Sequence, residues 1–458
     1  MQRRDFIKLS IVTGLALVLP QESLAKAIDF SKIDFSKSTY DDNNAQTIIV
    51  FLYGGASQLA GNISNIEDIE KNSQNSYNGY FRGITKTANG CWQEAGGAHM
   101  EKMISDGDMT LYRSCYSPTR EANNNKSHGL CTEQNQKGSF DVSGGGIVAN
   151  IGAILNNFGV INSDTMMPFV TMEGESHFYD DGSNKIPMYL KPASIEQDFS
   201  NPYERASWSV RTWIYYNKEE RKDDNATKSD AEGGFDPQFS KDMDTLAQKH
   251  NSNLAIKTNF DKRAKLESFI KSIKNAQTPD LGDDNYLNDT FANKLKSAVN
   301  ILDKNPQTKI LTLNTGGLGG WDDHNDARGY VTRMEYLFKA LRSATAHLKA
   351  IDKIGTINIM VFAEFGRNVN LNSAFGWDHG NLQNLYVIGG KNYFTHKGVV
   401  GETVLDVTGK LNRLWLKPKS GTYTFEPMSI ASTLYKLYGI ENPDELTNGS
   451  FSSLNILA

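Results

Sequence analysis

Short, continuous apolar runs recur along the chain and are separated by longer mixed stretches. Thr47 to Tyr53 is the first such run, and it stops at Gly54-Gly55, as a strand buried on both faces of a parallel sheet would. Comparable runs follow at Met109 to Tyr112, Phe169 to Met172, Lys309 to Leu313, Ile357 to Ala363 and Leu385 to Ile388. Continuous rather than alternating hydrophobicity predicts a sheet that helices cover on both faces.

One of the intervening stretches has a clear helical period. The apolar residues that recur at mostly helical spacing are Tyr330, Met334, Leu337, Phe338, Leu341, Leu348 and Ile351. The stretch joins two predicted strands, so it predicts a right-handed crossover between parallel strands. The predicted fold class is therefore α/β, a doubly wound, mostly parallel sheet sandwiched by helices, in a single domain from residue 28 to residue 458.

Two polar segments interrupt this rhythm. Asn62 to Gly90 is rich in Asn, Ser, Gly and Thr and predicts a long irregular excursion. Residues from about Asn217 to Asp284 are charged and polar, which predicts an insertion in the domain. The insertion could be a solvated loop followed by exposed helices, such as Lys262 to Ile273. Alternatively, it could be a mobile lid or a docking arm over one edge of the sheet.

The N-terminus has the pattern of an export signal. Arg3-Arg4-Asp5-Phe6-Ile7-Lys8 fits the twin-arginine motif, and Leu9 to Leu19 is apolar but too short to span a bilayer. Small residues offer cleavage sites at Ser23-Leu24-Ala25 or Ala25-Lys26-Ala27. We therefore predict a signal peptide over residues 1–27, passage through the twin-arginine export machinery, and a location in the periplasm or outside the cell. An uncleaved anchor or a chance arginine pair is the alternative.

Composition excludes some classes of function. The formal net charge of −5 and the lack of a basic patch argue against a nucleic-acid binder. Beyond the signal, no apolar run is long enough for a transmembrane helix. The 458 residues include only three cysteines, Cys91, Cys115 and Cys131, so an oxidising compartment would allow at most one bridge.

Three short motifs in the C-terminal half carry candidate chemistry. Gly320-Trp321-Asp322-Asp323-His324 and Glu364-Phe365-Gly366-Arg367 follow predicted strands, and Asp378-His379-Gly380 shortly precedes one. Open α/β sheets bind ligands at the carboxyl ends of their strands. Carboxylates and imidazoles gathered there predict a site for zinc, manganese or calcium. Alternatively, Asp322, Asp323 and Asp326 could cap a helix that starts near Ala327.

These motifs, with the early strand ending in Gly-Gly and the twin-arginine signal, resemble the family known as domain of unknown function 1501. That family is similar to the alkaline phosphatase and sulfatase superfamily, which implies a parallel-sheet α/β sandwich with metal ligands at the strand ends. By this resemblance Asp322, His324, Glu364 and His379 would be metal ligands. Asp323 or Asp378 would be a further ligand or would orient a ligating imidazole.

The chain departs from the superfamily pattern at two positions that usually bind metal. Ser57 follows Gly54-Gly55-Ala56 where an Asp is common, and Phe365 stands where a second His would follow the carboxylate. Tyr116-Ser117-Pro118-Thr119-Arg120 resembles the sulfatase signature, but it places Tyr116 at the reactive position. The resemblance therefore implies one metal site more strongly than two.

Residues for catalysis are predicted on two segments. Ser127 and Thr119 are candidate nucleophiles, with His128 as a nearby base, although their hydroxyl groups could instead cap the following helix. Arg367 could clamp a phosphate or sulfate, or it could pair with Glu364 or Asp378. The predicted function is an exported, metal-dependent hydrolase that cleaves phosphate or sulfate esters of a small molecule with a metal-activated water. The alternative is a catalytically eroded cell-envelope protein that binds or assembles a protein partner.

Overall fold

The computed structural model describes residues 26–72, 83–195, 276–325, 327–407 and 413–457, together with a few positions between 245 and 273. The predicted signal peptide, except Lys26 and Ala27, and most of the insertion at 217–284 lie outside the described residues. Within the predicted helix from Lys262 to Ile273, the few described positions are helical. Among the helices of the described part, none combines the length and hydrophobicity that a membrane crossing needs.

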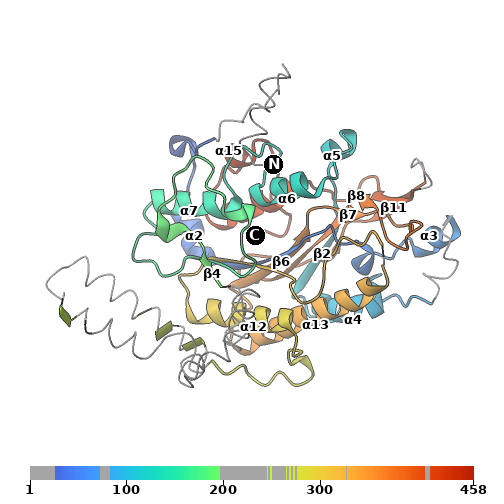
Figure 1. Ribbon diagram of the computed structural model, residues 1–458, viewed down its shortest axis with the longest axis horizontal. Coiled ribbons are helices and arrows are strands. Elements are labelled where there is room, and N and C mark those ends of the chain that lie inside the picture. The colour runs from blue at the N-terminus through green and yellow to red at the C-terminus, as the bar shows by residue number, and fades with distance from the viewer. Residues whose placement is uncertain are drawn as a thin grey trace, which may run out of the picture.

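A central eight-stranded sheet organises the molecule (Figure 1). Its strands in spatial order are β10 (Gly398–Val400), β2 (Met109–Cys115), β9 (Gln383–Gly389), β6 (Ile357–Ala363), β1 (Gln46–Leu52), β5 (Ile310–Asn314), β3 (Phe169–Thr171) and β4 (Ala193–Ser194). Neighbouring strands are parallel except where β9 pairs, because β9 runs antiparallel to both β2 and β6. The predicted mostly parallel α/β sheet is confirmed.

Strand β1 shows why the apolar runs are continuous. All seven of its residues are buried, and its successive side chains point to opposite faces of the sheet. Ile48 and Val50 belong to one hydrophobic core, whereas Ile49 and Phe51 belong to the other. Since both faces are covered, apolar side chains predominate on both faces of the strand.

Helices form a layer on each side of the sheet (Figure 1). One layer contains α4 (Ala98–Ser105), α12 (Thr290–Lys304) and α13 (Arg328–Ala350), and the other contains α2 (Lys37–Asn43), α6 (His128–Lys137), α7 (Ile147–Asn157) and α14 (Met428–Leu437). The predicted amphipathic helix is α13, and the apolar positions predicted within its bounds are buried. The sandwich of a sheet between helices is therefore confirmed.

Shorter elements complete the described part. The remaining α-helices are α3 (Ile66–Asn72), α5 (Pro118–Ala122) and α15 (Asp444–Thr447), with α3 inside the predicted irregular excursion. Short helices of other types are η1 (Phe30–Lys32), η2 (Leu59–Gly61), η3 (Gln93–Gly97), η4 (His177–Tyr179), η5 (Met188–Leu190) and η7 (Gly282–Asp284). Two small antiparallel pairs are β7 (Gly366–Arg367) with β8 (His379–Gly380), and β11 (Thr403–Asp406) with β12 (Trp415–Pro418). All three cysteines are buried and free.

The direction of β9 decides where the third sequence motif lies. Because β9 is antiparallel to β6, its beginning, rather than its end, lies at the edge where β6 ends. The short β7–β8 pair joins Arg367 to His379 at that same edge. The segment before β9 therefore meets the loops that follow β1, β5 and β6.

Candidate metal centre

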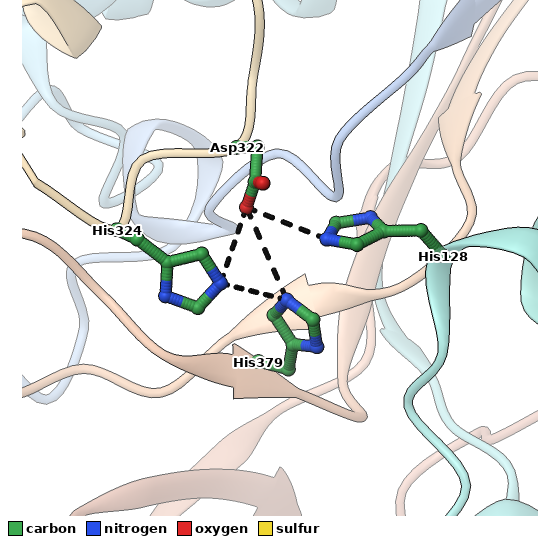
Figure 2. Close-up of side chains that lie close together, drawn as sticks. All are labelled: His128, Asp322, His324 and His379. Atoms are coloured by element: carbon green, nitrogen blue, oxygen red, sulfur yellow. Dashed lines mark hydrogen bonds and ion pairs between the residues drawn. The ribbon is translucent and has the colours of Figure 1, made fainter.

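Four side chains converge at this edge of the sheet (Figure 2). His128 is the first residue of α6, Asp322 and His324 lie in the loop between β5 and α13, and His379 begins β8. Each offers one possible ligand atom, and these atoms all lie within 4.8 Å of one another. Three of the four are predicted ligands, whereas His128 is predicted from the sequence as a catalytic residue.

The spacing of the four donor atoms suits a single ion. Asp322 Oδ1 lies 3.2 Å from His324 Nε2, 3.5 Å from His128 Nε2 and 3.9 Å from His379 Nε2. His324 Nε2 and His379 Nε2 are 2.8 Å apart. Tetrahedral ligands with zinc–nitrogen bonds of 2.0–2.1 Å are separated by roughly 3.3 Å. These four separations, from 2.8 to 3.9 Å, lie on both sides of that value.

The outward-facing nitrogen of each imidazole has an oxygen partner. His128 Nδ1 contacts Glu364 Oε1, His379 Nδ1 lies 2.6 Å from the Lys126 carbonyl, and His324 Nδ1 lies 3.4 Å from Asp378 Oδ1. Such acceptors favour the tautomer with the proton on Nδ1, which leaves an Nε2 lone pair directed inwards. Three lone pairs and a carboxylate oxygen then face one another, and a cation between them would relieve their repulsion.

The chemistry of this donor set discriminates between metals. Imidazole nitrogens suit zinc and other transition metals, whereas calcium and magnesium prefer oxygen ligands. Three imidazoles and one carboxylate therefore fit a zinc-type ion better than calcium, among the three metals that the sequence leaves open.

Arg367 sets the charge beside the centre. Its side chain is fully buried and donates to Asp322 Oδ1 at 2.6 Å, to the Gly55 carbonyl at 2.6 Å and to the Gly54 carbonyl. Burial alone would raise the pKa of Asp322, but the guanidinium holds it below its usual value. Burial and the same guanidinium lower the pKa of His379 to about 4. Both groups are thus in their metal-binding protonation states at neutral pH.

Of the two roles that the sequence leaves open for Arg367, pairing with a carboxylate is the one seen, and the carboxylate is Asp322 rather than Glu364 or Asp378. A further donor reaches the Trp377 carbonyl at 3.0 Å. The guanidinium is thus surrounded by acceptors of the protein itself. Its role as a clamp for an anion stays a prediction.

Two glycines allow the end of β1 to approach the site. A Cβ added to Gly54 would lie 2.5 Å from the backbone nitrogen of Asp322, and one added to Gly55 would lie 2.3 Å from the ring of Phe365. Both residues also have positive φ, at +111° and +74°. The Gly-Gly step at the end of the first predicted strand therefore lets the backbone contact Arg367 and the loop between β5 and α13, which carries Asp322, directly.

Glu364 lies behind His128 rather than among the four central side chains. Its carboxylate is 2% exposed and accepts from His128 Nδ1, from Thr132 Oγ1 at 2.8 Å and from the Gly54 amide at 3.2 Å. This is the position of a carboxylate that orients a ligating imidazole. Its predicted role as a direct ligand stays a prediction.

Asp378 has a similar place behind His324. Besides His324 Nδ1, its carboxylate binds the Asn372 amide at 3.2 Å and Arg413 at 3.1 Å. This contact matches the second of its two predicted roles, the orientation of an imidazole.

Of the acidic residues predicted to cap the following helix, the two that the structure describes, Asp322 and Asp323, do not do so. Helix α13 has Ala327 at its N-cap and no capping side chain. Asp323 is buried and pairs with Arg333, whereas Asp322 faces the centre. Asp326 lies outside the described residues.

The hydroxyl groups predicted for catalysis lie on α5 and at the start of α6. Ser127 occupies the N-cap position of α6, is exposed, and makes no capping side-chain hydrogen bond. Ser117 instead caps α5 by accepting from the Arg120 amide at 3.2 Å, and Thr119 is exposed within α5. Ser127 therefore keeps a hydroxyl group beside His128 that helix capping does not use, and its role as a nucleophile stays a prediction.

His128 is the residue whose place the sequence did not reveal. Its neighbour Thr132 lies one turn further along α6, and both side chains contact Glu364. That spacing of four residues on one helix face is a signal that sequence reasoning could use, but only once Glu364 is known to face α6.

Comparisons with known proteins give only distant similarities. No family model matches the chain, and no curated protein is similar enough to count as a relative. Ps i-CgsB, solved in complex with k-i-k-neocarrahexaose, is 11% identical over 89% of this chain and 74% of its own, with a TM-score of 0.38. Membership of the domain of unknown function 1501 family therefore stays a prediction.

Two further solved structures are similar at the same level. The lipoteichoic acid synthase LtaP from Listeria monocytogenes is 8% identical over 92% of this chain and 79% of its own, with a TM-score of 0.33. The alkaline phosphatase from the Antarctic bacterium TAB5 is 10% identical over 86% of this chain and 98% of its own, with a TM-score of 0.33. Similarities this distant do not indicate an activity. Any inference about activity has to be drawn from the site itself.

Proposed function

We propose that the protein is an exported, metal-dependent hydrolase of phosphate or sulfate esters that works in the periplasm or beyond. The observation that supports this proposal best is the convergence of His128, Asp322, His324 and His379 with an oxygen partner behind each imidazole. Side chains from three separate segments meet there with their donor atoms directed at one point. Structural polar clusters do not need that arrangement, whereas a metal ion does.

The residues of this chain have separate roles in the proposed reaction. A bound divalent ion would polarise the ester oxygen and lower the pKa of a water molecule. Glu364 and Asp378 fix the orientation of His128 and His324, and Arg367 keeps Asp322 ionised and in place. The exposed hydroxyl group of Ser127 is the candidate nucleophile, and water is the alternative.

The aromatic ring of Phe365, beside the four candidate ligands, favours a second function. The ring of Phe365 packs against His379 and His128, with centroid distances of 4.5 and 5.0 Å. An apolar ring therefore lies where the superfamily would place a second metal-binding His. This supports the alternative of an eroded, exported protein that keeps a structural metal and binds a partner at the cell envelope.

Metal content and turnover distinguish the two functions. We expect protein purified from the periplasm to carry about one zinc-type ion per chain by elemental analysis, and to hydrolyse aryl phosphates or sulfates. Asp322→Ala and His379→Ala should each reduce turnover by more than about 100-fold. His99→Gln, at a histidine that pairs with Glu335 away from the centre, is the matched control.

The outcomes separate clearly. Protein without stoichiometric metal would exclude the hydrolase. A bound ion with no turnover on either ester class would leave the eroded binding protein, whereas turnover that the two variants abolish would exclude it.

A further inference from the structure

A buried arginine contacts the residues behind the candidate metal centre. Arg120, on α5, is 2% exposed, and its guanidinium stays charged in a protein. It donates to the Gln134 and Asn135 side-chain oxygens at 3.1 and 2.7 Å, and to the Glu364 carbonyl at 2.9 Å. A longer contact reaches the Cys131 carbonyl at 3.4 Å. Burying a charge costs free energy unless hydrogen bonds satisfy it, and here four neutral oxygens do so.

Arg120 and Asn135 together fix the backbone at the end of β6. The Asn135 amide donates to the Ala363 carbonyl at 2.8 Å and to the Glu364 carbonyl at 3.1 Å. The guanidinium bonds both the Asn135 oxygen and the same Glu364 carbonyl. The three residues therefore form a closed ring of hydrogen bonds, and each of them is buried. Because a guanidinium presents its donors in one rigid plane, the ring sets the distance and angle between α6 and the end of β6.

The two elements that this ring joins carry both partners of one contact in the centre. His128 begins α6, and the Glu364 carboxylate accepts from its Nδ1 and from Thr132 Oγ1. The carbonyl group of Glu364 thus bonds Arg120, while its side chain bonds His128. A shift of α6 against β6 would move His128 Nε2 relative to the other three donor atoms. Groups that bind a metal have to be held within about 0.5 Å of the productive geometry.

We propose that Arg120 is a positioning residue of the metal centre, whose guanidinium holds α6 against the end of β6 so that His128 reaches the ion. The inference rests on the proposed function, because it requires a bound ion. The contacts of the guanidinium run to the helix and to the backbone of Glu364, so Arg120 acts on the ion through His128. Loss of the guanidinium should therefore weaken metal binding only where His128 is present to be positioned.

Zinc affinity and the spectrum of the cobalt-substituted, full-length protein test the inference. Arg120→Lys keeps the charge but loses the planar fork of donors. In competition with a chromogenic chelator, we expect it to bind zinc about 10- to 100-fold more weakly, the range for residues that support a metal ligand. The visible absorption of bound cobalt(II), which reports the coordination geometry, should change as well. Arg113→Lys is the matched control and should change neither readout, because Arg113 is also buried but donates to the Gly61 and Asn89 carbonyls.

A second background separates positioning from a general structural effect. In His128→Ala the ligand is absent, so Arg120→Lys should weaken zinc binding by less than about 2-fold there. An equal loss in both backgrounds would show that Arg120 only supports the fold, and would overturn the inference. If Arg120→Lys does not fold, Gln134→Met takes its place, since it removes one acceptor of the guanidinium and leaves the charge intact. We expect a smaller loss of zinc affinity from Gln134→Met, with the same dependence on His128.

The inference and the proposed function fail in different ways. If the wild type binds zinc and Arg120→Lys binds it equally tightly with an unchanged cobalt spectrum, Arg120 is not a positioning residue and the metal centre is unaffected. If the wild type binds neither zinc nor cobalt(II), the metal-dependent function is itself wrong, and the inference falls with it.

Discussion

Glu364 was assigned from the sequence to the metal, yet in the fold its carboxylate faces an imidazole. It accepts from His128 Nδ1, from Thr132 and from the Gly54 amide, and it is almost completely buried. A buried carboxylate in this position fixes the tautomer and the direction of the imidazole, which raises the basicity of the ligating nitrogen. The distinction between a ligand and its support has a measurable consequence.

Glu364→Gln should weaken zinc binding by about 10- to 100-fold, because the amide supports the His128 Nδ1 proton less strongly than a carboxylate does. Competition with a chromogenic chelator measures this affinity. Glu335→Gln changes another carboxylate that contacts a histidine, His99, and is the matched control. An unchanged affinity would contradict the supporting role, and complete loss of the ion would favour the direct ligand predicted from the sequence.

At the scale of elements, α13 carries a buried histidine whose ring contacts Tyr286, in the segment that leads into α12. His347 is 1% exposed, and the Tyr286 hydroxyl group lies 3.3 Å from its Nδ1. Burial lowers the pKa of His347 to about 4, so the fold favours the neutral imidazole. The unfolded chain, with a histidine pKa of about 6.5, takes up this proton first as the pH falls.

Acidification should therefore destabilise the protein between pH 6.5 and pH 4 through this helix. The sign follows from linkage: the unfolded state binds more protons in this window, so the free energy of unfolding falls as the pH falls. The contribution of His347 is about 3 kcal/mol. Urea unfolding gives the free energy of unfolding of the wild type and of His347→Gln at each pH. The difference between these two free energies should change by this amount across the window. If the difference in free energy of unfolding does not change with pH, His347 does not cause the destabilisation.

The same scale shows what hydrophobic patterns can and cannot predict. A strand that is buried on both faces is apolar throughout, and a helix that is buried on one face has apolar residues at a helical period. The sequence therefore predicted both the strands and α13. The antiparallel direction of β9 leaves no such trace, because a strand buried on both faces has the same composition in either direction. That direction nevertheless brings His379 to the other ligands.

At the scale of the whole molecule, the centre joins segments that are far apart along the chain. His128 comes from one helical layer, Asp322 and His324 follow a central strand, and His379 precedes β9. An ion that binds all four in the folded state and not in the unfolded chain must stabilise the fold by mass action.

Removal of the metal should therefore lower the melting temperature of the whole domain. At an ion concentration about 1,000 times the dissociation constant, the stabilisation is about 4 kcal/mol. Differential scanning calorimetry with and without a chelator measures the shift. His324→Ala, which lacks a ligand, should show a much smaller shift. Equal melting temperatures for the wild type with and without the chelator would argue against a bound ion.

By itself, the sequence determined the layers of this protein and the residue types at one edge of its sheet. Burial dictates local composition, so strands, the long helix and the Gly-Gly step at the end of β1 could all be read from neighbouring residues. Only the tertiary structure decided that His128 joins Asp322, His324 and His379, and that Glu364 and Asp378 lie behind imidazoles. Those contacts depend on strand direction and on residues hundreds of positions apart, and no local pattern encodes them.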